Sequence, residues 1–235
     1  MGTEELIGML IQPVLWVFLF SRGMAGMLGG SMSSGEYVSF MLPGIMALTA
    51  LGGAIGGGYT WLSERNMGLV REYWVAPVSR SGILLGNSFA NITKSLLQTA
   101  AIVLVGLLAG AVFSFNLAGV IGSIVLVVGY GLGFSSIALA IASSTDNEGG
   151  YHSMMMLLNL PLLFLSNALY SLESLPPWML IAAKLNPTSY LVDGIRQLMM
   201  KDSGDFPLWL CFTVVYGFGF LFLVMSVGAF RKAQR

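Results

Sequence analysis

The residues best suited to specific chemistry lie in a short charged segment, residues 63–82 (SERNMGLVREYWVAPVSRSG), between two long apolar stretches. On a helix, spacings of three and four residues place several of them on one face: Glu64, Arg65, Gly68, Arg71 and Glu72. Tyr73 and Trp74 fall on the opposite side, and Pro77 then stops or kinks the helix. Two interpretations stay open. The helix either lies at lipid headgroups, anchored by its aromatic side chains, or docks a cytosolic partner.

A second polar group lies inside an apolar stretch, where its residues share one helix face at spacings of three to four: Asn87, Asn91, Lys94, Ser95 and Gln98. A charge at the centre of a membrane helix costs about 2.5–3.5 kcal/mol on insertion scales, so Lys94 needs a reason to be there. The strip either lines a substrate route or subunit interface, or makes hydrogen bonds between helices while Lys94 extends to the headgroups.

Other kinds of chemistry have little support in the sequence. The chain has one histidine, His152, and one cysteine, Cys211, which excludes multi-histidine metal sites and an internal disulfide framework. It has no G-x-x-x-x-G-K-[ST] loop, since Lys94-Ser95 follows Thr93 instead of glycine, so we expect that it does not hydrolyse ATP itself. The motifs H-E-x-x-H and G-x-S-x-G are also missing, and a membrane enzyme is the weakest hypothesis.

The elements that must position these residues are membrane helices. Of 235 residues, 56% are hydrophobic and only 9% are charged, whereas soluble domains carry about 25% charged residues. The net charge is zero, so nothing points to nucleic acid as a partner. Six stretches reach the roughly 20 apolar residues that a spanning helix needs: 6–28, 38–62, 83–113, 117–142, 151–170 and 206–230. We expect an all-α membrane protein with one transmembrane domain over residues 1–235.

The distribution of lysine and arginine predicts the orientation of these spans. Six basic residues fall on the side that holds both termini: Arg65, Arg71, Arg80, Arg231, Lys232 and Arg235. Four fall on the other side: Arg22, Lys184, Arg196 and Lys201. We therefore expect a multi-pass protein of the cell membrane with both termini, and the charged segment, in the cytosol. In the second span, Gly52–Gly56 and Gly53–Gly57 are small-xxx-small pairs, which favour close helix packing in lipid.

The segment between the fifth and sixth spans is too apolar for a free loop (WMLIAA, LVDGI) and can form an amphipathic helix over 190–200. Asp193 and Arg196 are three residues apart there, close enough to pair. The alternative is a simple outer loop with Trp178 and Tyr190 at the interface.

Several motifs, in order along nearly the whole chain, are similar to those of one family. They are IQPVLW (11–16), LPGI (42–45), ERNMG (64–68) followed by APVSR (76–80), PLLFLSNALY (161–170), LPPWM (175–179) and LNPTSYLVDGIRQLM (185–199). Together they resemble the permeases of type 2 ABC exporters, and the SNALY stretch looks closest to drug-resistance-type members. One departure is that only MGTEE precedes the first span, where the family usually has a longer, basic interfacial helix.

The resemblance implies roles for individual residues. Residues 63–82 would be the coupling helix, which sits in a groove of the ATPase subunit, with the contacts made by Glu64, Arg65, Gly68, Arg71, Glu72, Pro77 and Arg80. The polar residues of the third span would line the pathway or a helix interface: Asn87, Asn91, Lys94 and Gln98. Re-entrant helices would close the outer end through Pro176, Trp178, Asn186, Pro187, Tyr190, Asp193 and Arg196.

The function implied by the resemblance is that of a permease subunit in an ATP-driven exporter of a hydrophobic drug, lipid or glycan-type cargo. Two copies would pair within membrane lipid and bind cytosolic ABC ATPase subunits, which would hold ATP and Mg; this chain itself would need no cofactor. The alternative is an ATP-independent secondary transporter or channel. Such proteins usually show internal repeats and carboxylates within their spans, and neither is evident here.

Overall fold

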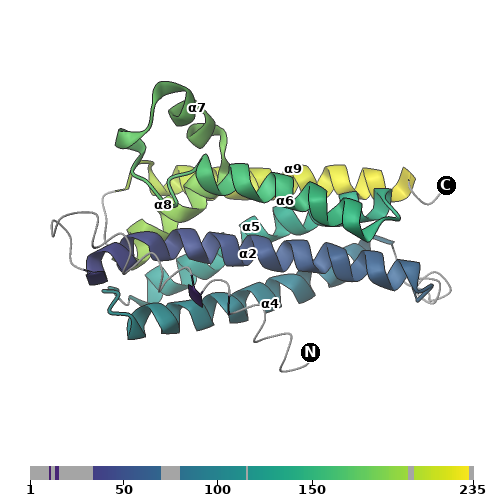
Figure 1. Cartoon of the computed structure of the whole chain (residues 1–235), viewed down its shortest axis with the longest axis horizontal. Coiled ribbons are helices and arrows are strands. Elements are labelled where there is room, and N and C mark those ends of the chain that lie inside the picture. Colours follow the sequence, from purple (N-terminus) through teal and green to yellow (C-terminus); the bar gives the residue numbers. More distant parts are fainter. Residues whose placement is uncertain are drawn as a thin grey trace.

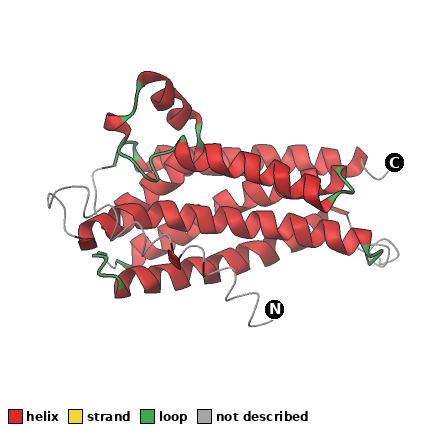
Figure 2. Cartoon of the chain, viewed as in Figure 1, coloured by secondary structure: helices red, strands yellow, loops and turns green. Residues whose placement is uncertain are grey.

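The computed structural model describes residues 11, 14–15, 34–69, 80–114, 116–200 and 204–232. Within these ranges the chain forms α-helices, one short 3-10 helix and connecting loops, without a β-strand (Figure 2). The elements are α2 (Ser34–Asn66), α4 (Arg80–Leu108), α5 (Leu117–Ser144), α6 (Glu148–Phe164), η1 (Leu172–Ser174), α7 (Pro177–Leu185), α8 (Pro187–Met200) and α9 (Leu208–Lys232). The expected all-α class is confirmed for this part of the chain.

The long helices form a bundle around α2 and α5 (Figure 1). α2 packs against α4, α5 and α8, and α5 packs against α9. The main core joins α2 to α5 through fully or almost fully buried side chains, among them Ala50, Ala54, Leu126 and Tyr130. α8 completes this core, because every residue from Pro187 to Arg196 is buried. α7 stands away from the bundle beside α8, in the upper part of Figure 1.

Four of the described helices are long and apolar enough to cross a membrane: Val38–Asn66, Gly86–Leu108, Leu117–Ser144 and Leu208–Gly228. They correspond to the predicted second, third, fourth and sixth spans. The predicted first span, 6–28, lies outside the described residues except for 11 and 14–15. The predicted fifth span corresponds to α6, which has 17 residues.

Two predicted spans extend about one and a half turns beyond the helices that the structure shows. The third span, expected to reach Phe113, ends at Leu108, because the chain turns at Gly110 with a φ of +93°, a conformation that glycine adopts without strain. The fifth, expected to reach Tyr170, ends at Phe164. There the Asn186 side-chain amide donates hydrogen bonds to the carbonyls of Leu162 and Leu165, both at 2.8 Å, which closes the last turn of α6.

The charged segment also begins differently from the expectation. α2 continues to Asn66, so Glu64 and Arg65 belong to its last turn and not to a separate short helix. Residues 67–69 then form a turn in which Gly68 has a φ of +81°. The prediction of one continuous helix with Glu64 and Gly68 on the same face is therefore wrong. Residues 70–79 lie outside the described part of the chain.

The glycines of α2 divide between a packed face and an open face. A Cβ atom built on Gly53 would overlap the Ser95 side chain of α4, and one built on Gly57 would overlap the Asn91 amide. The predicted close packing is thus confirmed for the Gly53–Gly57 pair. Gly52 and Gly56 have no heavy atom within 4 Å of a built Cβ, so this pair faces open space among the described residues.

This division predicts opposite outcomes for neighbouring substitutions. Gly57→Ala should force α2 and α4 apart and destabilise the protein by about 1–3 kcal/mol, the usual cost of overpacking. Gly56→Ala is the matched control, since it makes the same change one residue away and should leave stability unchanged or slightly raised. Thermal unfolding followed by circular dichroism in detergent measures both. Equal melting temperatures for the two variants would contradict the packing described here.

Candidate functional site at one end of the bundle

Three helix ends meet at one end of the bundle. α2 ends there at Asn66, α5 ends at Ser144, and α6 begins at Glu148 after the short turn 145–147. The carboxyl-terminal end of α9 lies at the same end (Figure 1). Residues 67–69, which belong to the predicted coupling segment, follow directly from α2 at this end.

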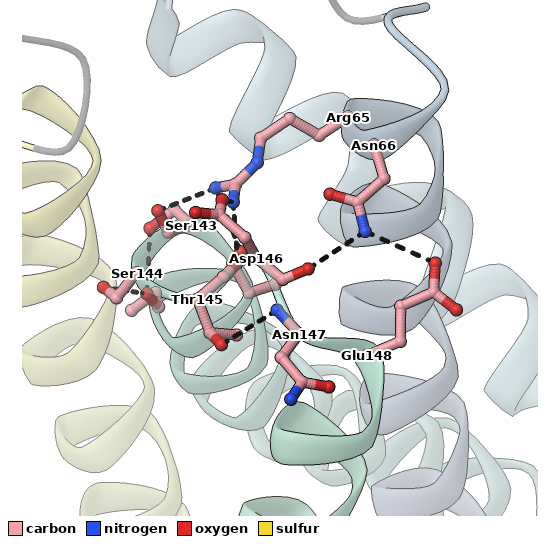
Figure 3. A network of polar contacts seen from close by, with 10 residues as sticks. Arg65, Asn66, Ser143, Ser144, Thr145, Asp146, Asn147 and Glu148 are labelled. Carbon is pink, nitrogen blue, oxygen red and sulfur yellow. Dashed lines mark hydrogen bonds and ion pairs between the residues drawn. The ribbon is translucent and has the colours of Figure 1, made fainter.

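Arg65 makes the densest set of polar contacts at this end (Figure 3). Its guanidinium donates hydrogen bonds to the backbone carbonyls of Ala142 at 3.3 Å, Ser143 at 2.8 Å and Thr145 at 2.6 Å. It also forms an ion pair with the Asp146 carboxylate. The last carbonyls of a helix lack partners within it and carry partial negative charge, so a guanidinium satisfies both needs at once. Arg65 therefore caps the carboxyl-terminal end of α5.

Neighbouring side chains extend this network to the start of α6. The Asn66 amide donates to the Asp146 carbonyl at 3.2 Å and to a Glu148 carboxylate oxygen at 3.4 Å. The Tyr59 hydroxyl donates to the other Glu148 oxygen at 3.0 Å. Asn147 caps α6, because its side-chain oxygen accepts hydrogen bonds from the backbone N–H groups of Gly149 and Gly150 at 2.9 and 3.2 Å.

Apolar packing supports the polar network. The Tyr151 hydroxyl donates to the Ile55 carbonyl at 2.7 Å, and Gly58 gives this ring room, since a built Cβ would overlap the hydroxyl. A separate apolar cluster lies next to it, formed by Trp61, Leu62, Ala138, Leu139, Ala142, Tyr151 and Met155. The ends of α2, α5 and α6 are thus joined both by hydrogen bonds and by buried surface.

The predicted coupling residues are distributed unevenly with respect to this site. Glu64 and Gly68 are half-buried beside Arg65, and Arg80 is the first residue of α4. Arg71, Glu72 and Pro77 lie outside the described residues. No described position tests whether these side chains contact a partner, so their role stays a prediction.

The predicted polar strip of the third span lies on α4, and two of its residues, Asn91 and Ser95, contact α2. Asn91 and Gln98 are buried, whereas Asn87 and Lys94 are half-buried. The Asn91 amide donates to the Asn87 side-chain oxygen at 2.6 Å, and the Ser95 hydroxyl donates to the Ala50 carbonyl of α2 at 3.4 Å. Asn91 and Ser95 therefore occupy a contact between helices. A role in a pathway remains a prediction for the strip.

The predicted outer residues occupy the other end of the bundle. Pro176 and Trp178 are exposed at the start of α7, and Asn186 and Pro187 are buried where α8 begins. Asn186 closes α6, as described above, and its side-chain oxygen accepts a hydrogen bond from the Thr188 N–H at 2.9 Å. Tyr190 is buried, and its hydroxyl donates to the Lys184 carbonyl at 2.7 Å.

The two charged residues of α8 bind different groups. Asp193 accepts hydrogen bonds from the backbone N–H groups of Asp205 and Phe206, at 3.0 and 2.9 Å, just before α9. Arg196 donates to the Phe40 carbonyl at 3.1 Å and to the Asn167 carbonyl at 2.9 Å, and its guanidinium lies 3.9 Å from the centre of the Phe40 ring. Both side chains thus fasten α8 to neighbouring segments.

Sequence reasoning missed the partners of Arg65. Ala142, Ser143 and Thr145 contribute only backbone carbonyls, about 80 positions further along the chain, so no side-chain pattern marks them. Asn147 was the detectable signal, because an asparagine before an amphipathic stretch is a common helix cap. Among the described residues, no group of three histidine, cysteine, aspartate or glutamate side chains is arranged to hold a metal ion.

The chain is similar to one protein family and to several individual proteins. Residues 13–227 match the family model described as ABC-2 family transporter protein. The chain is 31% identical over 208 residues to the ycf38 transport permease of Porphyra purpurea, with 84% of this chain and 68% of that protein covered.

Two further relatives are more distant. The daunorubicin resistance ABC transporter permease protein DrrB1 of Streptomyces coeruleorubidus is 25% identical over 230 residues, which cover 97% of this chain and 80% of that protein. Nodulation protein J of Rhizobium leguminosarum bv. trifolii is 25% identical over 211 residues, which cover 85% and 75% of the two chains.

The cap at the start of α6 gives a testable prediction. Asn147→Ala removes the side-chain oxygen that two backbone N–H groups share, and should destabilise the protein by about 1 kcal/mol. Asn147→Asp keeps the acceptor and is the matched control. Thermal unfolding in detergent compares the two variants. A melting temperature for Asn147→Ala equal to that of the control would show that the cap does not stabilise α6.

Proposed function

The chain belongs to the ABC-2 family of transporter proteins, and on this premise we propose that it is the permease subunit of an ATP-driven exporter. Permeases of this family are membrane components and not themselves catalytic. The family match over residues 13–227 is the observation that carries the proposal. The apolar helices of the bundle and the charged segment at the end of α2 support it.

The energy would come from a separate partner. A cytosolic ABC ATPase subunit would bind ATP and Mg, because this chain has no phosphate-binding loop of its own. Its groove would receive the segment after α2, with Glu64, Gly68, Arg71, Glu72, Pro77 and Arg80 near the contact. Two copies of the permease would pair around a central route in membrane lipid, each with its ATPase subunit.

The orientation follows from the basic residues. α2 and α9 end at the same end of the bundle, and Arg65 and Lys232 lie in or beside the last turns of these helices. The excess of basic residues at this end of the bundle supports its placement on the cytosolic side of the plasma membrane. Both termini would then lie in the cytosol. α7 and α8 would then close the outer end, as re-entrant helices do.

The cargo would be a hydrophobic drug, a lipid or a glycan-type molecule. One relative is named for daunorubicin resistance and another for nodulation, so the names of the relatives do not point to a single cargo. Daunorubicin is a practical probe, because it is the compound in the name of a relative whose alignment covers 97% of this chain.

The coupling prediction can be tested by co-purification. The double variant Arg71→Ala, Glu72→Ala should fold normally and retain at least tenfold less ABC ATPase, because it removes opposite charges from the proposed contact. Lys184→Ala, an exposed change on α7 at the other end of the bundle, is the control. Undiminished co-purification of the ATPase with the double variant would remove the coupling assignment, and a parent protein that binds no ATPase would remove the proposed function.

The polar strip needs a separate test. If it lines the pathway, Lys94→Met should lower daunorubicin uptake by inverted vesicles, and the ATPase activity that the drug stimulates, by about tenfold. Lys184→Met is the matched control, since it makes the same substitution at an exposed site outside the long helices. Uptake and stimulation equal to those of the parent would assign the strip to helix packing alone.

A further inference from the structure

We infer that Arg65 clamps the end of α2 to the turn between α5 and α6, so that these three helix ends move as one rigid unit. The inference rests on the proposed function for its meaning: the unit would carry motion of the coupling segment into the membrane. It assigns Arg65 an internal role, whereas the resemblance places this residue at the partner surface.

The first reason is where the guanidinium goes. Its contacts with three carbonyls and one carboxylate all lie within 142–146, at the end of α5. Only 23% of the Arg65 side chain is exposed, which leaves little of it for a second protein. Charged hydrogen bonds to several acceptors at once fix a side chain in position and direction, and Arg is suited to this because its donors form a rigid fork.

The second reason is that the clamp has support along α2. Tyr59 and Asn66 both bind Glu148 at the start of α6, and Tyr151 binds the Ile55 carbonyl. These contacts span three turns of α2, so the α5–α6 turn is held at several heights and not at one point. Because Arg65 supplies the ion pair and three of the hydrogen bonds in this set, its loss should also loosen the remaining contacts between α2 and α6.

The third reason is the position of the chain that enters the unit. Residues 67–69 continue directly from Asn66, so a force on the segment that follows acts first on the last turn of α2. α4 contacts α2 through a different surface, where Asn91 and Ser95 face Gly57 and Gly53. The side chain of Arg65 therefore connects the point of entry to the end of α5 and to the turn that leads into α6.

The clamp can be tested on the permease alone. Spin labels on Thr60→Cys and Ser153→Cys, two exposed positions on α2 and α6, report the separation of these helices in lipid nanodiscs. Cys211→Ser removes the native thiol from the background. Arg65→Gln should at least double the width of the interspin distance distribution. Ser144→Ala, an exposed change at the same end of α5, is the control and should not alter it.

The rigid unit is tested with the ABC ATPase subunit that co-purifies with the chain. ATP should leave the 60–153 distance of the parent unchanged, whereas Arg65→Gln should gain a second population when ATP is added. A merely stabilising contact would not make the distance depend on ATP in this way. If Arg65→Gln does not fold, Asp146→Asn replaces it with the same expected direction and a smaller broadening.

The outcomes separate the two hypotheses. An unchanged distribution in the folded variant, or a second ATP-dependent population in the parent, would overturn the clamp. Loss of ATPase co-purification with Arg65→Gln at an unchanged 60–153 distribution would return Arg65 to the partner surface. A parent that binds no ATPase would remove the proposed function, while the nanodisc measurement would still decide whether Arg65 holds the three helix ends together.

Discussion

The ends of a helix carry backbone groups that have no hydrogen-bond partner within the helix. In this bundle, side chains from distant parts of the chain supply such partners. Where a helix end packs against other helices, side chains of the protein can satisfy these groups in place of water. Arg65 serves the carbonyls at the end of α5, Asn186 those at the end of α6, and Asp193 the N–H groups before α9. Each of these side chains comes from a different segment of the chain than the backbone it satisfies. The caps therefore also decide which helix ends lie together.

Polar groups also find partners where two helix faces pack together. Gly53 and Gly57 let α4 approach α2 closely enough for Asn91 and Ser95 to be buried, while no described residue packs against Gly52 and Gly56. Burial of polar side chains at such a contact is favourable when they find hydrogen bonds there, as Ser95 does with the Ala50 carbonyl. A strip of polar residues in a membrane helix is thus compatible with ordinary packing, and its position alone does not identify a pathway.

In this member of the ABC-2 family, different contacts hold the two ends of the bundle. The ends of α2, α5 and α6 are joined by a polar network and a buried apolar cluster. At the other end, α7 stands apart from the bundle, while α8 is buried and fastened through Arg196 to Phe40 and Asn167. In the proposed exporter, a partner on one side would drive the transporter, and the Arg65 network would supply the stiff connection where that force enters.

Apolar length and motifs that are local in the chain were enough to predict the membrane class, the family and four of the long helices. Spacing alone indicated two glycine pairs on α2, and the tertiary structure decided that Gly53 and Gly57 are the pair that packs against α4. The sequence could not determine that Arg65 caps α5 or that Asn186 closes α6 at Phe164, because the acceptors are backbone carbonyls about 80 and 20 residues away. Every residue has such a carbonyl, so only the tertiary structure decides which one a side chain reaches.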